Sequence, residues 1–218
     1  MNIRTQKSSQ PVRVVALVDW NSQIHAARPG IGSEIELAKR TLDYVGRVIG
    51  RALAQTRQET RFDVSLRLYH GWHKGFEATA RRRAMTTVIA ETDFVALSCK
   101  GNVSIRDNVQ FGDQLNSASS KRIHTRLNCH LPNTLRNLSG AGGEVEEKMV
   151  DTAIASDIVD IAHREPSNWI LVLGEDDDLV PPLLVAEPMV AAHNGNILLV
   201  RRRSGEPFLK LQDIWCAI

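Results

Sequence analysis

Short apolar runs alternate along the chain with longer stretches in which apolar residues recur every three or four positions. Residues 12–18 (VRVVALV) are β-branched and almost continuously apolar, which predicts a strand covered on both faces. The expected strands are residues 12–18, 63–69, 94–98, 169–173 and 197–200, and the expected helices are residues 33–55, 76–90, 145–163 and 179–193. This alternation predicts an α/β fold with a mostly parallel central sheet and helices on both faces.

The periodic pattern fades between residues 101 and 143, where Asn, Ser and Gly accumulate. We expect a long loop or insertion there, within a single domain that spans residues 1–218. Ser33 is the expected N-cap of the first long helix, because a serine side chain can accept a hydrogen bond from the first turn. A short last element is expected near residues 209–215.

Composition is that of an ordinary globular protein, with 43% hydrophobic and 24% charged residues. The net charge of +2 comes from 27 Lys and Arg against 25 Asp and Glu, so it neither requires nor excludes an anionic partner. Three widely spaced cysteines form no disulfide framework, which favours a reducing compartment. The N-terminus lacks the apolar core of a signal peptide, and no apolar run is long enough to cross a bilayer. We expect a cytoplasmic protein without membrane contact, and we leave homo-oligomer formation open.

Acidic residues follow two of the predicted strands directly. Asp19 ends the first strand, and Asp176 and Asp178 follow the WILVL strand at residues 169–173. The carboxyl ends of parallel strands meet at one edge of a sheet, so we expect these carboxylates to lie close together. A single Asp after a strand is more often a helix N-cap, but two strands that end in this way favour a shared site.

The helix predicted at residues 145–163 adds two further acids. Asp157 lies within its apolar stripe, so burial requires a partner for it: a hydrogen-bond donor, a cation or a metal. Asp151 lies in the early turns, where it either reaches the acidic edge or only favours the helix dipole. Several converging carboxylates need a counter-charge, and oxygen ligands suit Mg²⁺ or Mn²⁺. Such an ion polarises a phosphoryl oxygen and lowers the pKa of bound water, which favours phosphodiester hydrolysis.

At these residues the sequence resembles the NYN family, within the larger PIN-like nuclease group. The matching segments cover about a third of the chain, and they are Val14 to Asp19, Lys148-Met-Val-Asp151 with Asp157, Gly174-Glu-Asp-Asp-Asp-Leu-Val-Pro181 and Gly195-Asn-Ile-Leu-Leu-Val200. The resemblance implies a Rossmann-like PIN fold, a bound Mg²⁺ or Mn²⁺ ion and RNA as the partner and substrate. It also implies that the catalytic, metal-binding acids are Asp19, Asp151, Asp176 and Asp178.

The chain departs from the family pattern around these acids. Ser22 stands where the family has Asn, with Asn21 one place early, and Glu175 and Leu179 replace Gly and Phe. Asp177 adds a further negative charge. The candidate second-shell residues are Asn21, Ser22, Asp157 and Asp177.

Basic clusters are candidate contacts for the phosphates of RNA, although a charged run is more often a solvated surface. The predicted RNA-binding residues are Arg201, Arg202, Arg203, Lys121, Arg122 and Arg126, and Arg81 to Arg83 form a third cluster. Tyr69 and Trp72 either stack on bases or pack in the core.

The sequence therefore predicts a metal-dependent endoribonuclease that hydrolyses RNA. One alternative is a non-catalytic RNA-binding or regulatory module that keeps the fold, and the other is a metal-dependent phosphatase. A zinc site is not expected, because His70 with His73 lacks the repeated ligand spacing of a zinc finger.

Overall fold

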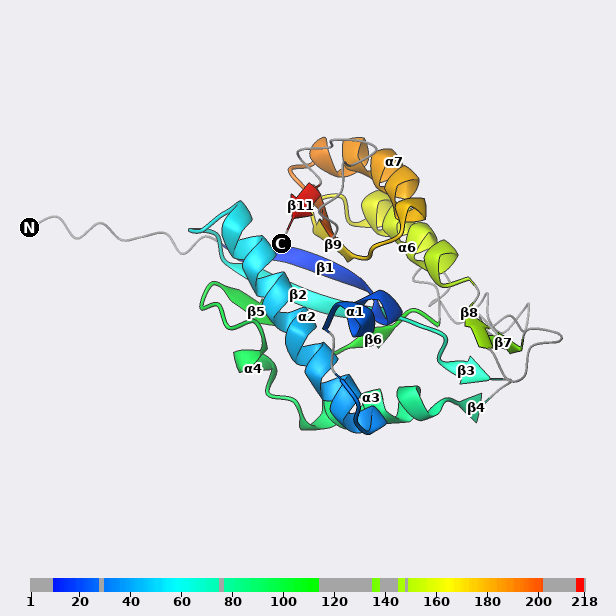
Figure 1. Cartoon of the computed structure of the whole chain (residues 1–218). Helices are drawn as coiled ribbons and strands as arrows, with labels where there is room; N and C mark the ends of the chain where they lie inside the picture. Colours follow the sequence, from blue (N-terminus) through cyan, green and yellow to red (C-terminus); the bar gives the residue numbers. More distant parts are fainter. Residues whose placement is uncertain are drawn as a thin grey trace, which may run out of the picture.

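The computed structural model describes residues 10–27, 30–74, 77–113, 135–137, 145–147, 149–201 and 215–217. Its centre is a parallel sheet in the order β11-β10-β9-β1-β2-β5, and β6 also pairs with β2 (Figure 1). These strands are β1 (Val12–Asp19), β2 (Phe62–Tyr69), β5 (Val103–Ile105), β6 (Gln110–Phe111), β9 (Trp169–Leu173), β10 (Asn196–Arg201) and β11 (Trp215–Ala217). Without β6, chain order across the sheet is the reverse of 3-2-1-4-5-6, a Rossmann-like topology whose direction changes between β1 and β9.

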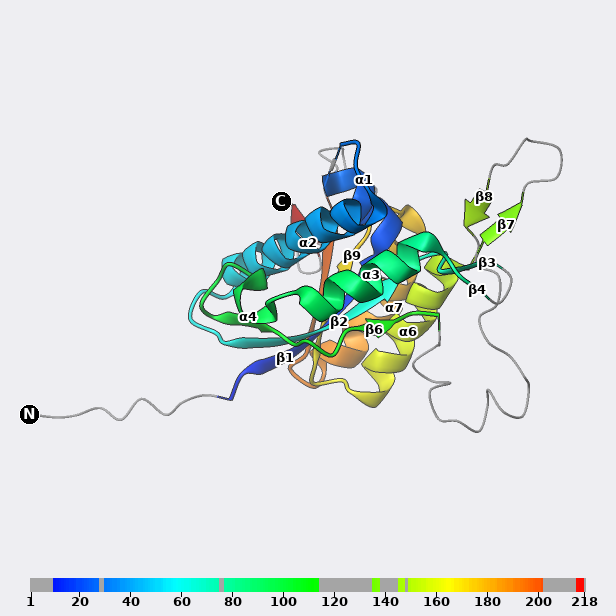
Figure 2. The same cartoon turned by 90° about the horizontal axis from the view of Figure 1, so that it is seen from below.

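Helices cover both faces of this sheet (Figures 1 and 2). One face carries α1 (Trp20–Ala27), α2 (Glu34–Thr56) and α3 (Ala80–Glu91), and the other carries α6 (Val150–Arg164) and α7 (Val180–Ala191). Alternate residues of β1 serve the two cores: Ala16 and Val18 pack with the α2 side, whereas Leu17 packs with the α6 side. The predicted α/β fold with two covered faces is confirmed. None of the helices in the described ranges combines the length and the apolar character that a bilayer-crossing helix needs.

The predicted N-cap at Ser33 is confirmed. Its hydroxyl accepts from the Glu36 amide at 3.3 Å, and the Glu36 carboxylate accepts from the Ser33 amide at 2.9 Å. This reciprocal capping box fixes where α2 begins.

The strand predicted at residues 94–98 is wrong, because this segment forms the short helix α4 (Phe94–Leu97). Asp93 caps it by accepting from the Val95 amide at 3.0 Å, and such a short apolar run has no period that separates strand from helix. The third strand of the sheet is instead β5. Residues 103–105 and 110–111 therefore belong to the sheet, although we expected a loop from residue 101.

The helix predicted from residue 145 begins only at Val150. Residues before it form β8 (Val145–Glu147), which pairs antiparallel with β7 (Leu135–Asn137), and Met149 takes a left-handed conformation with φ of 68°. This backbone reversal separates β8 from α6. A second small hairpin joins β3 (His73–Lys74) to β4 (Glu77–Ala78). Residues 114–134, 138–144 and 202–214 lie outside the described ranges, and so does most of the predicted element at 209–215.

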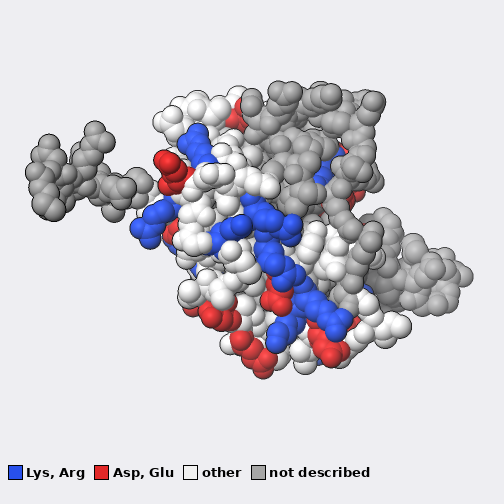
Figure 3. Space-filling model, turned by 60° about the vertical axis from the view of Figure 1, so that its left-hand side comes forward, with Lys and Arg blue, Asp and Glu red and all other residues white. Residues whose placement is uncertain are grey.

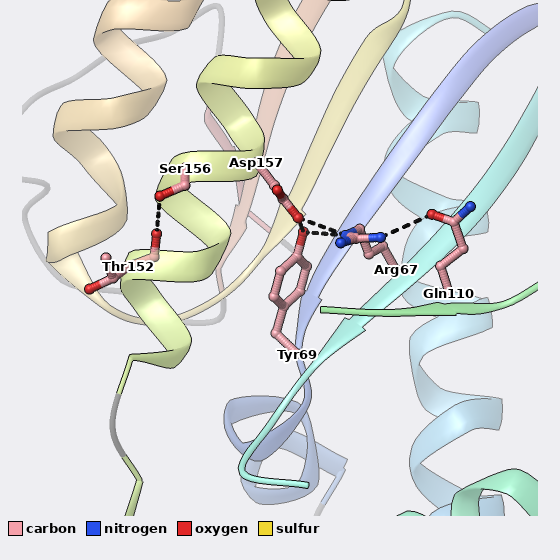
Figure 4. Close-up of polar contacts among 6 residues, drawn as sticks. All are labelled: Arg67, Tyr69, Gln110, Thr152, Ser156 and Asp157. Carbon is pink, nitrogen blue, oxygen red and sulfur yellow. Dashed lines mark hydrogen bonds and ion pairs between the residues drawn. The ribbon is translucent and has the colours of Figure 1, made fainter. Parts of the chain in front are cut away.

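Asp157 is fully buried in a network between α6 and β2 (Figure 4). Its Oδ2 accepts from Arg67 Nε and from the Tyr69 hydroxyl, both at 2.7 Å. Arg67 Nη1 in turn donates to Gln110 Oε1 at 3.1 Å. Burial would lower the pKa of Arg67, but its interactions with Tyr69 and with the Asp157 carboxylate outweigh burial and raise this pKa. Burial also raises the pKa of Tyr69 well above 10.0, so the hydroxyl stays protonated and donates.

The expectation of a partner for Asp157 is thus confirmed, and the partner is an arginine. Tyr69 is 1% exposed and Trp72 is 0% exposed, so both pack in the core and neither is available to stack on a base.

Replacement of Asp157 by Asn is expected to lower the free energy of unfolding by about 3–5 kcal/mol, because it leaves Arg67 buried without a counter-charge. Asp160→Asn is the matched control on the same helix. It breaks the Asp160–Arg164 pair of 2.8 Å, in which the arginine side chain is half-exposed, and should lower the free energy of unfolding by about 1 kcal/mol or less. Urea unfolding of both variants measures the difference. Equally small losses of stability would contradict the claim that the fold depends on the buried Arg67–Asp157 pair.

Candidate metal centre

A cavity of about 570 Å³ lies at the carboxyl edge of the sheet, where the strand order reverses between β1 and β9. The first residue after β9 is Gly174, and a Cβ built on it would lie 3.7 Å from the Asp19 Cβ, so the two strand ends are adjacent. The cavity is lined by Asp19, Asn21, Ser22, His25, Ala26, Glu175, Asp176 and Asp177. Two carboxylates that the sequence placed after different strands, Asp19 and Asp176, therefore face one hollow.

Asp19 is only 9% exposed and stands at the start of α1. Its Oδ1 accepts from the Ser22 amide at 3.2 Å, so it also caps this helix. Its pKa is raised to about 6. Burial is the largest cause, the hydrogen bonds from Ser22 act in the opposite direction, and the charges of Asp151 and Glu147 add to the increase. The ionised form of Asp19 is therefore held at a disadvantage unless a cation joins it.

Asp151 is half-buried in the first turn of α6. Burial is the largest cause of its raised pKa, and the negative charges of Asp176, Asp178 and Glu147 add to this increase. Asp151 and Asp178 do not line the cavity itself. They lie near enough for their charges to act on one another, so the acidic edge extends from the cavity towards α6.

Glu147 is a further acid at this edge, and we did not predict it. It ends β8, and its charge raises the pKa of both Asp19 and Asp151. Its Oε1 lies 2.5 Å from Nδ1 of His70, a buried residue that directly follows β2. Its place four residues before Asp151 was the only sequence feature that pointed to the site. Because a helix was expected from residue 145, the contact of Glu147 with His70 was not predicted.

The turn after β9 is held by its own hydrogen bonds and by Arg201. Asp176 accepts from the Asp178 amide at 2.9 Å and so caps the 3-10 turn η2 (Asp177–Leu179). Arg201 ends β10, and its Nη2 donates to the Glu175 carbonyl oxygen at 2.7 Å and to the Asp177 carboxylate.

This arrangement corrects the predicted RNA contact of Arg201. The residue is 4% exposed and its guanidinium holds the acidic turn, so it is not a surface cation for phosphates. The strand β10 is parallel to β9, and its last side chain therefore meets the turn that follows β9. The remaining predicted RNA-binding residues lie outside the described ranges: Arg202, Arg203, Lys121, Arg122 and Arg126.

The second-shell candidates divide into two groups. Asn21, Ser22 and Asp177 line the cavity, as predicted residues around the acids. Asp157 instead pairs with Arg67 and Tyr69 in the core and is not part of the cavity lining.

Within the described part of the chain, no three His, Cys, Asp or Glu side chains are placed to hold a metal ion together. Like charges repel one another, and without a cation among them carboxylates separate or take up protons. The donor set itself consists of carboxylate oxygens, which suits Mg²⁺ or Mn²⁺ in preference to zinc. The residues fit a hard cation by chemistry, but the described side chains do not form a ready coordination shell.

Asp19→Asn should raise the free energy of unfolding at pH 7 without divalent ions, by on the order of 3 kcal/mol, because a pKa about 2 units above 3.8 makes ionisation unfavourable in the fold. The stability that protonated Asp19 contributes is present below about pH 4 and is lost as pH rises towards 6. The variant should lack this loss, and Asn still caps a helix. Urea unfolding at several pH values in EDTA tests this, and a destabilised variant at pH 7 would show that the fold stabilises the ionised form of Asp19.

Comparison of the chain with protein-family models, with curated protein sequences and with solved structures found no match. The Rossmann-like α/β topology therefore comes from the coordinates alone. The resemblance to the NYN family stays a prediction that rests on the motifs around Asp19, Asp151 and Asp176.

Proposed function

We propose that this protein is a Mg²⁺- or Mn²⁺-dependent ribonuclease that hydrolyses phosphodiester bonds of RNA, with a sheet of the PIN-like kind. The observation that carries the proposal is Asp19, a buried carboxylate with a raised pKa that faces the same cavity as Asp176 at the reversal of the strand order. Sites in open parallel sheets form at this position. Perturbed carboxylates in a cavity are also a common mark of catalytic sites.

Two groups of residues at the cavity would have different roles, the acids in binding the cation and the donors on α1 in contacting phosphate. Asp19 and Asp176 would bind the cation, and Asp151 lies outside the cavity lining but near enough to interact with the charges of Asp176 and Glu147. The ion would supply Lewis-acid stabilisation of charge on a phosphoryl oxygen. The Ser22 amide fixes the orientation of Asp19, and Arg201 fixes the turn that carries Asp176.

Helix α1 adds hydrogen-bond donors without negative charge to the cavity. Asn21 and His25 project from α1 and line the same cavity as the acids. An amide and an imidazole can donate hydrogen bonds to phosphate oxygens, which the carboxylates would repel. This side of the cavity therefore suits contact with the RNA backbone beside the scissile bond.

One observation favours a second candidate, a non-catalytic RNA-binding module. The described acids do not form a preassembled set of metal ligands. A chain that keeps the fold and the cavity without ordered ligands would bind RNA but leave it intact.

The native chain should cleave single-stranded RNA in Mn²⁺ and should be inactive in EDTA. Asp19→Asn and Asp176→Asn should each lower the rate by about 100-fold or more, since each removes a ligand of the ion that stabilises the developing charge. Asp160→Asn, which alters the ion pair with Arg164 on α6, is the control and should keep the native rate.

Gel analysis of labelled RNA and a phosphate-release assay on nucleotides separate the candidates. Intact RNA with retained RNA binding selects the non-catalytic module. Release of phosphate from nucleotides beside intact RNA selects a phosphatase.

A further inference from the structure

A line of arginines runs along the outer side of α2. Arg40, Arg47 and Arg51 are all exposed. At about 100° per residue their spacings of seven and four place them within roughly 20° of a common line. The buried residues Leu42 and Ile49 lie on the opposite side of the helix, so this line faces solvent. We call these three arginines the α2 ridge, and Figure 3 shows a band of Lys and Arg across the molecule there.

Two guanidinium groups of the α2 ridge are open to a ligand. Among the described residues, Arg47 and Arg51 have no hydrogen bond or ion pair, in contrast to arginines elsewhere on the surface. Arg106 is paired with Asp63, and Arg164 is paired with Asp160. An exposed arginine without a carboxylate partner can offer its planar set of donors to a phosphate.

The α2 ridge begins beside the cavity. Arg40 Nη1 lies 4.0 Å from the position of a Cβ on Gly30, in the loop that follows α1, and α1 forms a wall of the cavity through His25 and Ala26. From Arg40 the ridge extends for about 17 Å along the helix axis, at 1.5 Å per residue over eleven residues. It therefore leads from the α1 wall across the outer surface of α2.

The charges next to the α2 ridge favour a strand over a surface as the partner. Asp43 flanks the line by roughly 60°, and Glu36 lies at its beginning, where its carboxylate accepts from the Ser33 amide. A planar anionic membrane would meet these acids together with the arginines. A nucleic-acid backbone can follow the narrow cationic line beside these acids, and the acid-rich cavity by itself would repel it.

We infer that the α2 ridge is the track along which the backbone of single-stranded RNA approaches the cavity. This inference rests on the proposed ribonuclease function, since it assigns the path of that substrate. Arg47 and Arg51 hold phosphates at a distance from the scissile bond. Their loss weakens binding and leaves the chemistry at the acids unchanged.

The test measures binding of a short fluorescein-labelled single-stranded RNA to the full chain in EDTA, by anisotropy over a range of salt concentrations. The double variant Arg47→Gln/Arg51→Gln should bind about 10- to 30-fold more weakly at moderate salt. Its plot of log K against log salt should be shallower by about 1.4, since each phosphate contact on a single strand contributes about 0.7. Arg106→Gln/Arg164→Gln is the matched control with the same change in charge, and it should bind within about twofold of the native chain.

A second arm in Mn²⁺ separates this inference from the proposed function. If the native chain cleaves RNA, the Arg47→Gln/Arg51→Gln variant should show a raised KM with kcat little changed, and Arg47→Lys/Arg51→Lys should restore most of the affinity. If the native chain does not cleave but the Gln variant still loses affinity, the ribonuclease proposal fails and the track is supported.

Three results would overturn the track. They are native RNA affinity in the Arg47→Gln/Arg51→Gln variant, an equal loss in the control variant, and binding of the native chain to phosphatidylserine-containing vesicles without binding to RNA.

Discussion

Parallel pairing of β1 with β2 on one side and with β9 on the other determines where the candidate site of this protein lies. Because the three strands run in the same direction, the residues that follow them meet at one edge. Asp19 ends β1, His70 follows β2, and the acidic turn follows β9. Asp151 reaches this edge on helix α6 instead of on a strand. That helix is held on the sheet by its buried apolar side and by the contact of Asp157 with β2.

Two buried aspartates illustrate how a structural acid differs from a candidate functional one. Asp157 is fully buried, but a guanidinium and a phenol donate to its carboxylate, so its charge is compensated within the fold. Asp19 is 9% exposed, but within the described part of the chain the donor to its carboxylate is Ser22, and the charges of Asp151 and Glu147 raise its pKa. The fold therefore tolerates an unfavourable charge at Asp19. This charge is consistent with the proposed cation site, since stability is commonly traded for function at such positions.

The sequence was sufficient for features that depend on neighbours along the chain. The apolar run at residues 12–18 and the cap at Ser33 are local signals, and the structure has both. The placement of Asp19 and Asp176 at one edge needed only one further rule, that parallel strands share their carboxyl edge. The segment at residues 94–98 was misassigned because four or five apolar residues carry no period.

The features that the sequence could not show depend on partners far apart in the chain. The contact between His70 and Glu147 joins residues that β8 brings together, and a helix was expected where β8 lies. Arg201 was expected to contact RNA because its strand ends near the acids, but nothing near it in sequence reveals that its guanidinium is buried against the turn after β9. Its 4% exposure follows from sheet order, which no local pattern encodes.

The pairing of Arg67 with Asp157 also limits how this chain can diverge. Each residue is tolerated in the interior only while the other is present, because either one alone would be an unbalanced buried charge. Evolutionary change at one position is therefore coupled to change at the other, ninety residues away. Among descendants of this sequence, the two sites should vary together, as a charged pair or as a pair of uncharged side chains of similar volume.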